Sequence, residues 1–455
     1  MEGREASDGH GRQRFWSTAI SRATRSIVGD NGRIIVGLTS RGAAGDKKRR
    51  MKLPNVAATQ PSTGFFYGLT VALFFYGWLS VNIYLPILPK LEEIFDTTSQ
   101  MARLTVTAYL LGFSVAQLVL GTLSDRFGRR PIIILGLALA TIGAVLTALT
   151  SDIYSFTAAR FLESVGLGVA PVLSRSILTD SLDRPHIAIA ISYAVMASAL
   201  TPAVAPIVGG YLDLFLSWRS IFFFLALYGC VLTTWIFFRL PETNKDRTPE
   251  LRPSRVLSEY LAMLRTRQYS GYLISYGIAF GGLIGYYAAA PYLFIKVLGY
   301  RPHEYGYLLL INAAFYIFGV WTGKTIVVRS GSKRPIAFAI LAYLIASLVF
   351  VVMDSFTDMS AVTILIPMCV FIFGSGLVSP AANSGAMSIF KTKAGASTAI
   401  IGFSIAIGGA FFNTGLSTVH ISRLWELGTY VAIIALASAA NYFINLQEKP
   451  RASVA

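Results

Sequence analysis

Arg160 and Glu163 are two opposite charges inside a largely apolar segment, residues 153–173. On a helix, residues three apart share one face and lie close enough to pair. Charged residues inside a membrane are rare, usually face a cavity or one another, and tend to be functional. Burial favours the neutral, protonated form of a carboxyl group, and a guanidinium opposes this. We therefore predict that Glu163 can take up and release a proton beside Arg160. The alternative is that Glu163 only neutralises Arg160, because an unpaired buried charge is costly.

The segments around this pair are built for a membrane. The chain has 455 residues, of which 54% are hydrophobic and 14% are charged, whereas soluble proteins carry about a quarter charged residues. Continuous apolar runs long enough to cross a hydrocarbon layer of ~30 Å as helices recur throughout, and their lack of alternation excludes a β-barrel. The sequence predicts an all-α membrane protein with twelve transmembrane helices. We place the helices near residues 65–88, 103–123, 131–150, 153–173, 188–212, 219–239, 270–294, 303–323, 335–353, 361–381, 396–418 and 427–446.

Positive charge alternates between the connections of these helices. The tails and every second loop hold 32 of the 39 Lys and Arg residues, the other loops hold 6, and Arg160 lies within a span. Cytoplasmic segments of membrane proteins carry an excess of Lys and Arg, so we expect both termini in the cytoplasm and the protein in the cell (inner) membrane. The net charge of +16 then follows from topology, and we expect membrane lipids but no nucleic acid as partners.

A basic central loop divides the chain into two pseudo-symmetric six-helix halves. The turn "GTLSDRFGRRP" (121–131) is echoed by "VVRSGSKRP" (327–335) at the matching place of the second half, as a six-plus-six duplication requires. The expected parts are a basic, disordered cytoplasmic tail (1–63), the N-terminal half (64–240), a cytoplasmic central loop (241–269), the C-terminal half (270–446) and a cytoplasmic tail (447–455).

The N-terminal tail leaves three interpretations open. It can be a solvated basic segment that touches anionic lipid. Met51 can instead be the true start, with residues 1–50 not belonging to the native protein. A third interpretation is that "RQRFWSTAISRATRSIVG" (12–29), which is Arg-rich and amphipathic, forms a targeting or interfacial helix.

No pattern in the sequence indicates an enzyme or a cofactor. Cys230 and Cys369 lie in apolar runs and show no metal or disulfide spacing, so we expect them to act as small packing residues. The four histidines, His10, His186, His303 and His420, are neither mid-span nor in a ligand spacing. No G-x-x-x-x-G-K-[ST] motif is present, so a proton gradient is expected as the energy source in place of ATP.

Twelve spans, a central loop and the turn at 121–131 together resemble the major facilitator superfamily, and more specifically its Bcr/CflA branch of drug exporters. The resemblance runs from about Tyr67 to Ala440. It is carried by "NIYLPILPKL" (82–91), "TAYLLGFSVAQLVLGTLSDRFGRRP" (107–131), "RFLESVGLG" (160–168), "APIVGGYLDLFLSWRSIFF" (205–223), "LPET" (240–243) and "AGASTAIIGF" (394–403). It implies two six-helix halves that alternate access to a central cavity.

In the family, the aspartate of the 121–131 turn latches the two halves together on the cytoplasmic side, which assigns this role to Asp125. Its carboxylate can accept hydrogen bonds from the next helix or pair with Arg175, and glycines in the turn permit sharp bends. The alternative is a topology-setting loop with a solvated charge cluster. The expected conformational latch comprises Gly121, Asp125, Arg126, Gly128, Arg129, Arg130 and Arg175.

The fifth predicted helix carries "APIVGG", which retains Pro206, Gly209 and Gly210 of the superfamily's antiporter motif, with Ala205 where a glycine is usual. The motif favours export over uptake. Plain helix packing explains it about as well, because small residues let neighbouring helices approach closely.

Close relatives usually carry an acid before the "YLP" element of the first helix, where this chain has Asn82. Asn82 and Arg160 lie at similar depths, so the proton-binding carboxylate could have moved to Glu163. Polar and aromatic residues within or near the ends of the spans suit a cavity for bulky, partly apolar solutes, although each one singly is as well explained by packing. The predicted substrate-cavity residues are Asn82, Tyr84, Tyr109, Tyr286, Tyr287, Tyr292, Asn312 and Asn383.

The sequence thus predicts a monomeric secondary active exporter of small amphipathic molecules that works by proton antiport. The alternatives with the same fold are an uptake symporter, a uniporter and a dedicated exporter of one metabolite such as a siderophore. A membrane-bound receptor or enzyme would need a sensing domain or a catalytic constellation, and neither is visible in the sequence.

Overall fold

The computed structural model describes residues 28–29, 33–34, 61–244, 253–390, 393–417, 421 and 423–447. The chain divides into two compact units, Met1–Gln60 and Pro61–Ala455. In the first unit, the two-residue strands β1 (Val28–Gly29) and β2 (Arg33–Ile34) pair antiparallel. Residues 12–27 of the expected interfacial helix, and Met51, lie outside the described residues.

The second unit is helical. Its elements are α2 (Thr63–Asn82), η1 (Leu85–Ile87), α3 (Leu88–Ile94), α4 (Ser99–Phe127), α5 (Arg129–Leu149), α6 (Ile153–Leu167), α7 (Val169–Ser181), α8 (Arg184–Phe215), α9 (Trp218–Arg239), α10 (Pro253–Leu264), α11 (Arg267–Pro291), η2 (Tyr292–Val297), α12 (Pro302–Ser330), α13 (Lys333–Phe356), α14 (Ala361–Ile389), α15 (Ala394–Ser417), α16 (Leu424–Asn441) and η4 (Tyr442–Leu446). Within the described residues, 12 helical stretches are long and apolar enough to cross a membrane. Each predicted span falls on one of them, so the predicted fold class is confirmed.

Large apolar side chains stay exposed on the outward sides of these helices. Phe238 is 76% exposed, Val328 80% and Phe411 74%. In water, exposed apolar surface on this scale would drive association, whereas lipid tails solvate it. The exposure pattern therefore fits a helix bundle surrounded by hydrocarbon.

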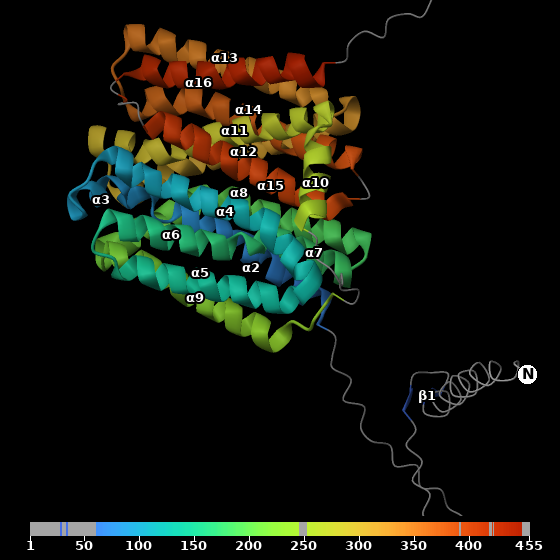
Figure 1. Ribbon diagram of the computed structural model, residues 1–455. Coiled ribbons are helices and arrows are strands. Elements are labelled where there is room, and N and C mark those ends of the chain that lie inside the picture. The colour runs from blue at the N-terminus through green and yellow to red at the C-terminus, as the bar shows by residue number, and fades with distance from the viewer. Residues whose placement is uncertain are drawn as a thin grey trace, which may run out of the picture. The chain divides into compact units, whose positions relative to one another are not determined.

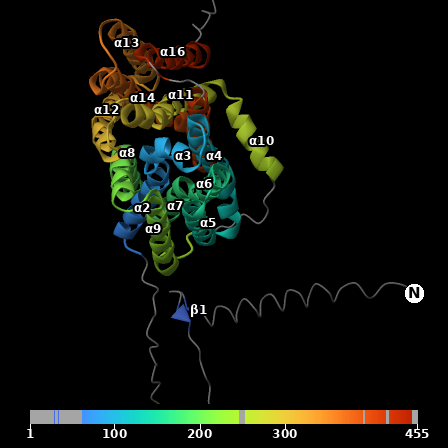
Figure 2. The same cartoon turned by 90° about the vertical axis from the view of Figure 1, so that its left-hand side faces the viewer.

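The helices form two groups that lie against each other. Figure 1 shows α2 to α9, blue to green, on one side and α11 to α16, yellow to red, on the other. Seen along the helices in Figure 2, α13 and α16 lie at the outer edge of one group, and α5 and α9 at the outer edge of the other. The groups meet mainly where α4 packs on α15 and where α8 packs on α12. We call them the N-half and the C-half.

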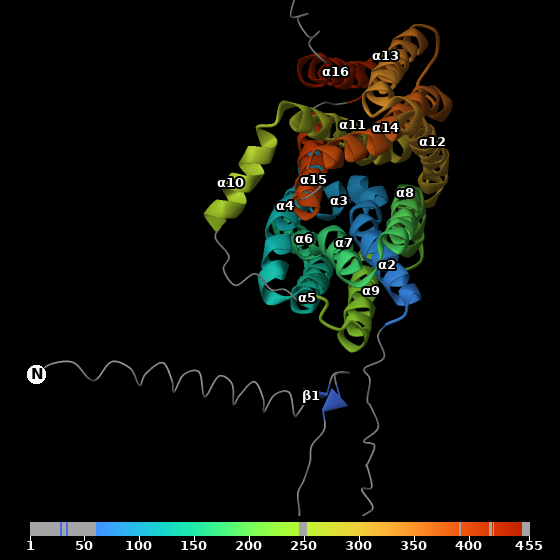
Figure 3. The same cartoon turned by 90° about the vertical axis from the view of Figure 1, so that its right-hand side faces the viewer.

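The central loop contains a helix that the sequence analysis did not predict. Figure 3 shows α10 alongside the bundle, reaching from the C-half toward the N-half. The Tyr260 hydroxyl donates to the Leu118 carbonyl of α4 at 3.4 Å. Glu259 pairs with Lys393, just before α15, at 2.6 Å. The central loop is thus fixed to both halves through α10.

Polar contacts also join the halves at one end of the bundle. We call the end where α2 begins and η4 ends the tail face, and the other end the opposite face. At the opposite face Lys296 pairs with Glu92 at 2.5 Å, and Arg103 Nη2 donates to the Ser417 carbonyl at 2.8 Å. Asn413 Nδ2 donates a hydrogen bond to the Arg103 carbonyl at 3.0 Å. These contacts join the halves at the opposite face.

Candidate functional site

Helix α6 carries the charged pair, and its start is fixed by a cap. The Asp152 carboxylate accepts the backbone N–H groups of Tyr154 and Ser155, both at 2.9 Å. Aspartate at this position satisfies N–H groups that have no partner inside the helix. From this start, Arg160 and Glu163 fall on the buried face of α6, and both side chains are 0% exposed.

Glycines on the neighbouring helices let α6 pack very closely. A Cβ added to Gly143 of α5 would lie 2.6 Å from Glu163 Cα. One added to Gly112 of α4 would lie 2.9 Å from the Phe161 carbonyl oxygen. Because no larger residue fits at these crossings, α6 is held in one position against α4 and α5.

Arg160 and Glu163 form an ion pair that Ser80 of α2 completes. The distance from Arg160 Nη1 to Glu163 Oε2 is 2.6 Å. The Ser80 hydroxyl donates to Glu163 Oε1 at 2.5 Å and lies 3.1 Å from Arg160 Nη1. Arg160 Nη2 donates to the Ser80 carbonyl at 2.9 Å. This network joins the first and fourth spans at the depth that the sequence analysis assigned to Asn82 and Arg160.

Aromatic rings enclose the guanidinium. Arg160 Cζ lies 4.3 Å from the ring centroid of Tyr84 and 4.5 Å from that of Tyr109. Phe222 of α9 lies further away, at 5.6 Å. A cation held over aromatic faces is stabilised by the ring quadrupole. Arg160 Nε is buried without a hydrogen-bond partner, so these rings provide part of its solvation.

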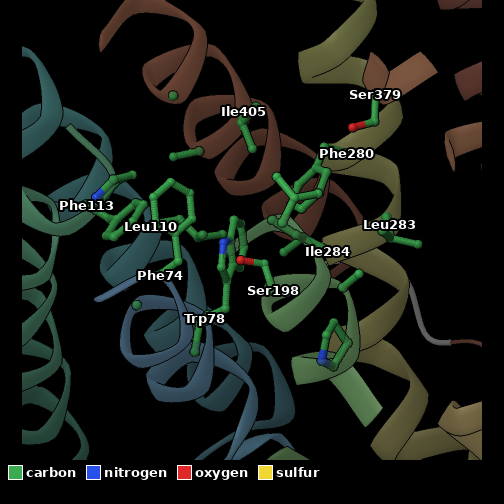
Figure 4. A pocket seen from close by; sticks show the side chains of 18 of the residues that line it. Phe74, Trp78, Leu110, Phe113, Ser198, Phe280, Leu283, Ile284, Ser379 and Ile405 are labelled. Atoms are coloured by element: carbon green, nitrogen blue, oxygen red, sulfur yellow. The ribbon is translucent and has the colours of Figure 1, made fainter. Parts of the chain in front are cut away.

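A cavity of about 330 Å³ lies between the two halves. Figure 4 shows Phe74 and Trp78 from α2, Leu110 and Phe113 from α4, and Phe280 and Ile284 from α11 around it. Ser198 of α8, Ser379 of α14 and Ile405 of α15 also line the cavity. A mostly apolar space with a few polar groups is typical of a site for a small amphipathic molecule.

The structure divides the predicted cavity residues into two sets. Asn82, Tyr109, Tyr287 and Asn383 line the cavity. The predicted cavity residues that do not line it are Tyr84, Tyr286, Tyr292 and Asn312. The pair Arg160 and Glu163, predicted for proton coupling, also lies outside the lining.

This corrects the expectation that the second set faces the cavity. The Tyr109 ring covers Arg160 on the cavity side. Tyr286 is satisfied inside the C-half, where Asn312 Nδ2 donates to its hydroxyl at 3.2 Å. Tyr292 spans the halves at the opposite face, donating to the Leu88 carbonyl at 3.2 Å. Each of these polar groups finds its partner within packed protein.

Arg175 also lies elsewhere than predicted. It does not pair with Asp125; instead it lines the cavity, where its Nη1 donates to Thr398 Oγ1 of α15 at 3.1 Å. The α7 residue that contacts the 121–131 turn is Asp180, whose carboxylate accepts from Arg129 Nε at 3.1 Å. Five residues rotate a helix by about 140°, so Arg175 and Asp180 face different sides of α7. Arg175 is therefore a cavity residue in this conformation.

The 121–131 turn forms a charge cluster within the N-half. Asp125 pairs with Arg129, and Gly128, at φ 106°, makes the bend that glycine favours. Glu242 of "LPET" accepts the Arg129 N–H at 2.9 Å and the Arg130 N–H at 3.3 Å. A carboxylate at a helix N-terminus is favoured by the helix dipole.

The sequence analysis assigned no role to Glu242 or to Ser80. The acidic residue of "LPET" within a basic region was the available signal for Glu242, and a small polar residue beside Asn82 was the signal for Ser80. Two further residues of the predicted latch have contacts of their own. A Cβ added to Gly121 would lie 3.0 Å from Val172 Cγ1, and Arg126 Cζ lies 5.2 Å from the Phe127 ring centroid.

The "APIVGG" motif lies inside α8, where two glycines meet different neighbours. A Cβ added to Gly209 would lie 1.8 Å from the Ile83 carbonyl oxygen, where the first span breaks before η1. One added to Gly210 would lie 2.7 Å from the His303 backbone nitrogen of α12. Pro206 lies one turn earlier in α8. The motif therefore brings α8 against both halves.

A family model described as the Major Facilitator Superfamily matches residues 69–413. The chain belongs to this superfamily and is a multi-pass membrane transporter.

Two relatives match over most of their length. The bicyclomycin resistance protein homolog of Haemophilus influenzae is 27% identical over 364 residues, which is 78% of this chain and 91% of the relative. The multidrug resistance protein D of Escherichia coli is 28% identical over 370 residues, which is 81% of this chain and 92% of the relative. The expected resemblance to the Bcr/CflA branch is confirmed.

Solved structures with the same fold include a D-xylose–proton symporter, with a TM-score of 0.68, 15% identity and coverage of 86% of this chain and 98% of that one. A partially occluded inward open conformation of the xylose transporter XylE from Escherichia coli matches with a TM-score of 0.66 and 15% identity, covering 85% of this chain and all of the other. At this identity the likeness shows the fold alone.

Proposed function

We propose that this transporter exports small amphipathic molecules by proton antiport, with Glu163 as the proton-binding group. The observation that carries the proposal is the contact between the buried pair and the cavity wall. Tyr109 touches both, because its ring lies over Arg160 and also lines the cavity. The relatives named for bicyclomycin, multidrug and chloramphenicol resistance support export.

Proton exchange at Glu163 requires water to reach it, and in this conformation the carboxylate is fully buried. We infer that Tyr109 moves in another conformation of the transport cycle. Protonated Glu163 then releases Arg160, and the Arg160–Ser80 bonds between the fourth and first spans rearrange. Deprotonated Glu163 restores the closed network described above.

The direction of transport depends on orientation in the membrane. The excess of Lys and Arg on the tail face supports a cytoplasmic location for that face, as the positive-inside rule implies. From the contacts that join the halves at the opposite face, we infer that solute enters the cavity from the cytoplasmic side in this conformation. It leaves on the other side after the two halves have changed their relative orientation.

Drug-susceptibility panels with bicyclomycin and chloramphenicol, together with uptake into inverted membrane vesicles, test the proposal. Cells producing the wild type should tolerate more drug than cells producing Glu163→Gln. In the vesicles, an acidic interior should drive drug uptake by the wild type and not by the variant, because glutamine binds no proton.

Asp358→Asn is the matched control, since Asp358 lies in an exposed turn between α13 and α14. It removes one carboxylate and should leave uptake unchanged. Undiminished proton-driven uptake by Glu163→Gln would remove the coupling role of this residue. If drug uptake by the wild type is also independent of the pH gradient, the protein is a uniporter and not a proton antiporter.

A further inference from the structure

The cavity holds a positive charge that no carboxylate balances. Among the described residues that line it, Arg175 is the one with a charged side chain. Its guanidinium makes a hydrogen bond to Thr398 of α15, and its Nε is buried without a partner. The ion pairs of the described residues do not include Arg175.

The carboxylate behind the cavity wall does not offset this charge. Glu163 is held by Arg160 at 2.6 Å and by Ser80 at 2.5 Å, and it is not among the residues that line the cavity. When Glu163 is deprotonated, the pair is neutral; when it is protonated, Arg160 adds positive charge. The pair therefore adds no net negative charge beside the cavity in either protonation state.

Other polar groups in the wall are uncharged. Asn383 of α14 carries a buried Oδ1 without a partner, and Tyr276 and Ser379 are bonded to each other at 3.0 Å. Aromatic and aliphatic side chains form most of the remaining lining, as Figure 4 shows. The unsatisfied hydrogen-bonding capacity thus lies with Arg175 and Asn383, at the wall of an apolar space.

We propose that the cavity selects anionic amphipathic solutes over neutral ones and neutral ones over cations, with Arg175 binding an acceptor group such as a carboxylate. The proposal rests on the transport function above and names the substrate class of the same cavity. Hydrogen bonds from a guanidinium to a carboxylate are strong and bidentate. Like charges repel strongly where water does not screen them.

A competing role for Arg175 is to tie the halves together through Thr398. The two roles separate in the variant Thr398→Val, which removes the hydrogen bond between Arg175 and Thr398 and keeps the guanidinium. If Arg175 serves solute recognition, this variant retains the charge preference.

Three naphthalene derivatives of one shape test the preference: 2-naphthoate, 2-naphthamide and 2-naphthylmethylammonium. Isothermal titration calorimetry of the protein in lipid nanodiscs measures the affinity of each compound. Titration of empty nanodiscs gives the heat of partitioning into lipid.

The wild type should bind naphthoate most tightly and the ammonium compound least. Arg175→Gln should weaken naphthoate binding about tenfold, as the loss of one charge-assisted hydrogen bond implies, and should change naphthamide binding little. Arg175→Lys should keep the order of the three ligands. Asn383→Asp, which adds a carboxylate to the wall, should weaken naphthoate and strengthen the ammonium compound, and it tests the proposal if Arg175 variants do not fold.

Equal binding of the three ligands by the wild type would overturn the proposal, as would equal losses for naphthoate and naphthamide in Arg175→Gln. These measurements use no pH gradient. Failure of proton antiport would therefore appear in the vesicle experiment, and failure of the charge preference would appear here.

Discussion

The phenol ring of Tyr109 lies with its centroid 4.5 Å from Arg160 Cζ and also forms part of the cavity wall. Its hydroxyl donates to the Gly77 carbonyl of α2 at 3.1 Å. The Tyr109 side chain thus contacts both the ion pair and the space that solute would occupy. Its role as a barrier between them can be tested by substitution.

Tyr109→Ala should open a path between the cavity and Glu163. In liposomes loaded with a pH-sensitive dye, we expect the variant to dissipate a pH gradient without solute, whereas the wild type holds the gradient. Tyr109→Phe keeps the ring over Arg160 and should restore the barrier. If liposomes that contain Tyr109→Ala also hold the pH gradient, Tyr109 is not the barrier.

Removing one partner of the buried pair should cost far more stability than removing both. Glu163→Leu leaves Arg160 buried without its counter-charge and should destabilise the protein by about 3–5 kcal/mol. The double variant Arg160→Met with Glu163→Leu should recover most of this loss, because no unpaired charge remains. A double-mutant cycle of unfolding free energies in detergent measures the coupling; additive losses would contradict a tight ion pair.

Gly209 should tolerate no side chain. Gly209→Ala would place Cβ against the Ile83 carbonyl oxygen, and overpacking of this kind costs about 1–3 kcal/mol. We expect a lower thermal midpoint and slower transport. Gly415→Ala is the matched control, since an added Cβ there meets no atom within 4 Å. Equal midpoints for the two variants would argue against close packing by α8.

Glu242 should stabilise the start of α5 through its charge. Glu242→Gln keeps a hydrogen-bond acceptor and removes the interaction with the helix dipole, so we expect a loss of up to about 1 kcal/mol. Glu93→Gln, on an exposed position of α3, changes net charge equally and should have no effect. The thermal midpoint in low salt checks both, and high salt should shrink the difference if the interaction is electrostatic.

The cap of α6 should make stability depend on pH. Hydrogen bonds from the Ser155 hydroxyl and from the backbone N–H groups of Ser155 and Tyr154 lower the pKa of Asp152. A lowered pKa means that the cap stabilises the fold above the ordinary aspartate value of about 4 and that this contribution is lost as pH falls. The midpoint difference between wild type and Asp152→Asn should therefore shrink in acid; a constant difference would contradict a charged cap.

The spans and their number could be predicted because each depends on a local property, the length of an apolar run. The placing of Arg160 beside Glu163 was equally local, since three residues on a helix share a face. The resemblance to known exporters added the two halves and the turn at 121–131.

The sites that the sequence analysis missed or misplaced depend on contacts between distant segments. Glu242 lies more than a hundred residues from the helix end that it caps. The exclusion of Glu163 from the cavity depends on where the Tyr109 ring points, and hydrophobic patterning does not encode this. Recognising Asp180 rather than Arg175 as the α7 residue at the turn would have required the rotation of α7, which the break between α6 and α7 sets.

Helix α10 is joined to α11 by Arg265 and Thr266 alone, so it travels with the C-half when the transporter changes conformation. Its Tyr260 contact on α4 must then slide or break. The position of α10 relative to α4 therefore reports how the two halves are oriented. The distance between a spin label on α10 and one on α4 would follow that orientation throughout the cycle.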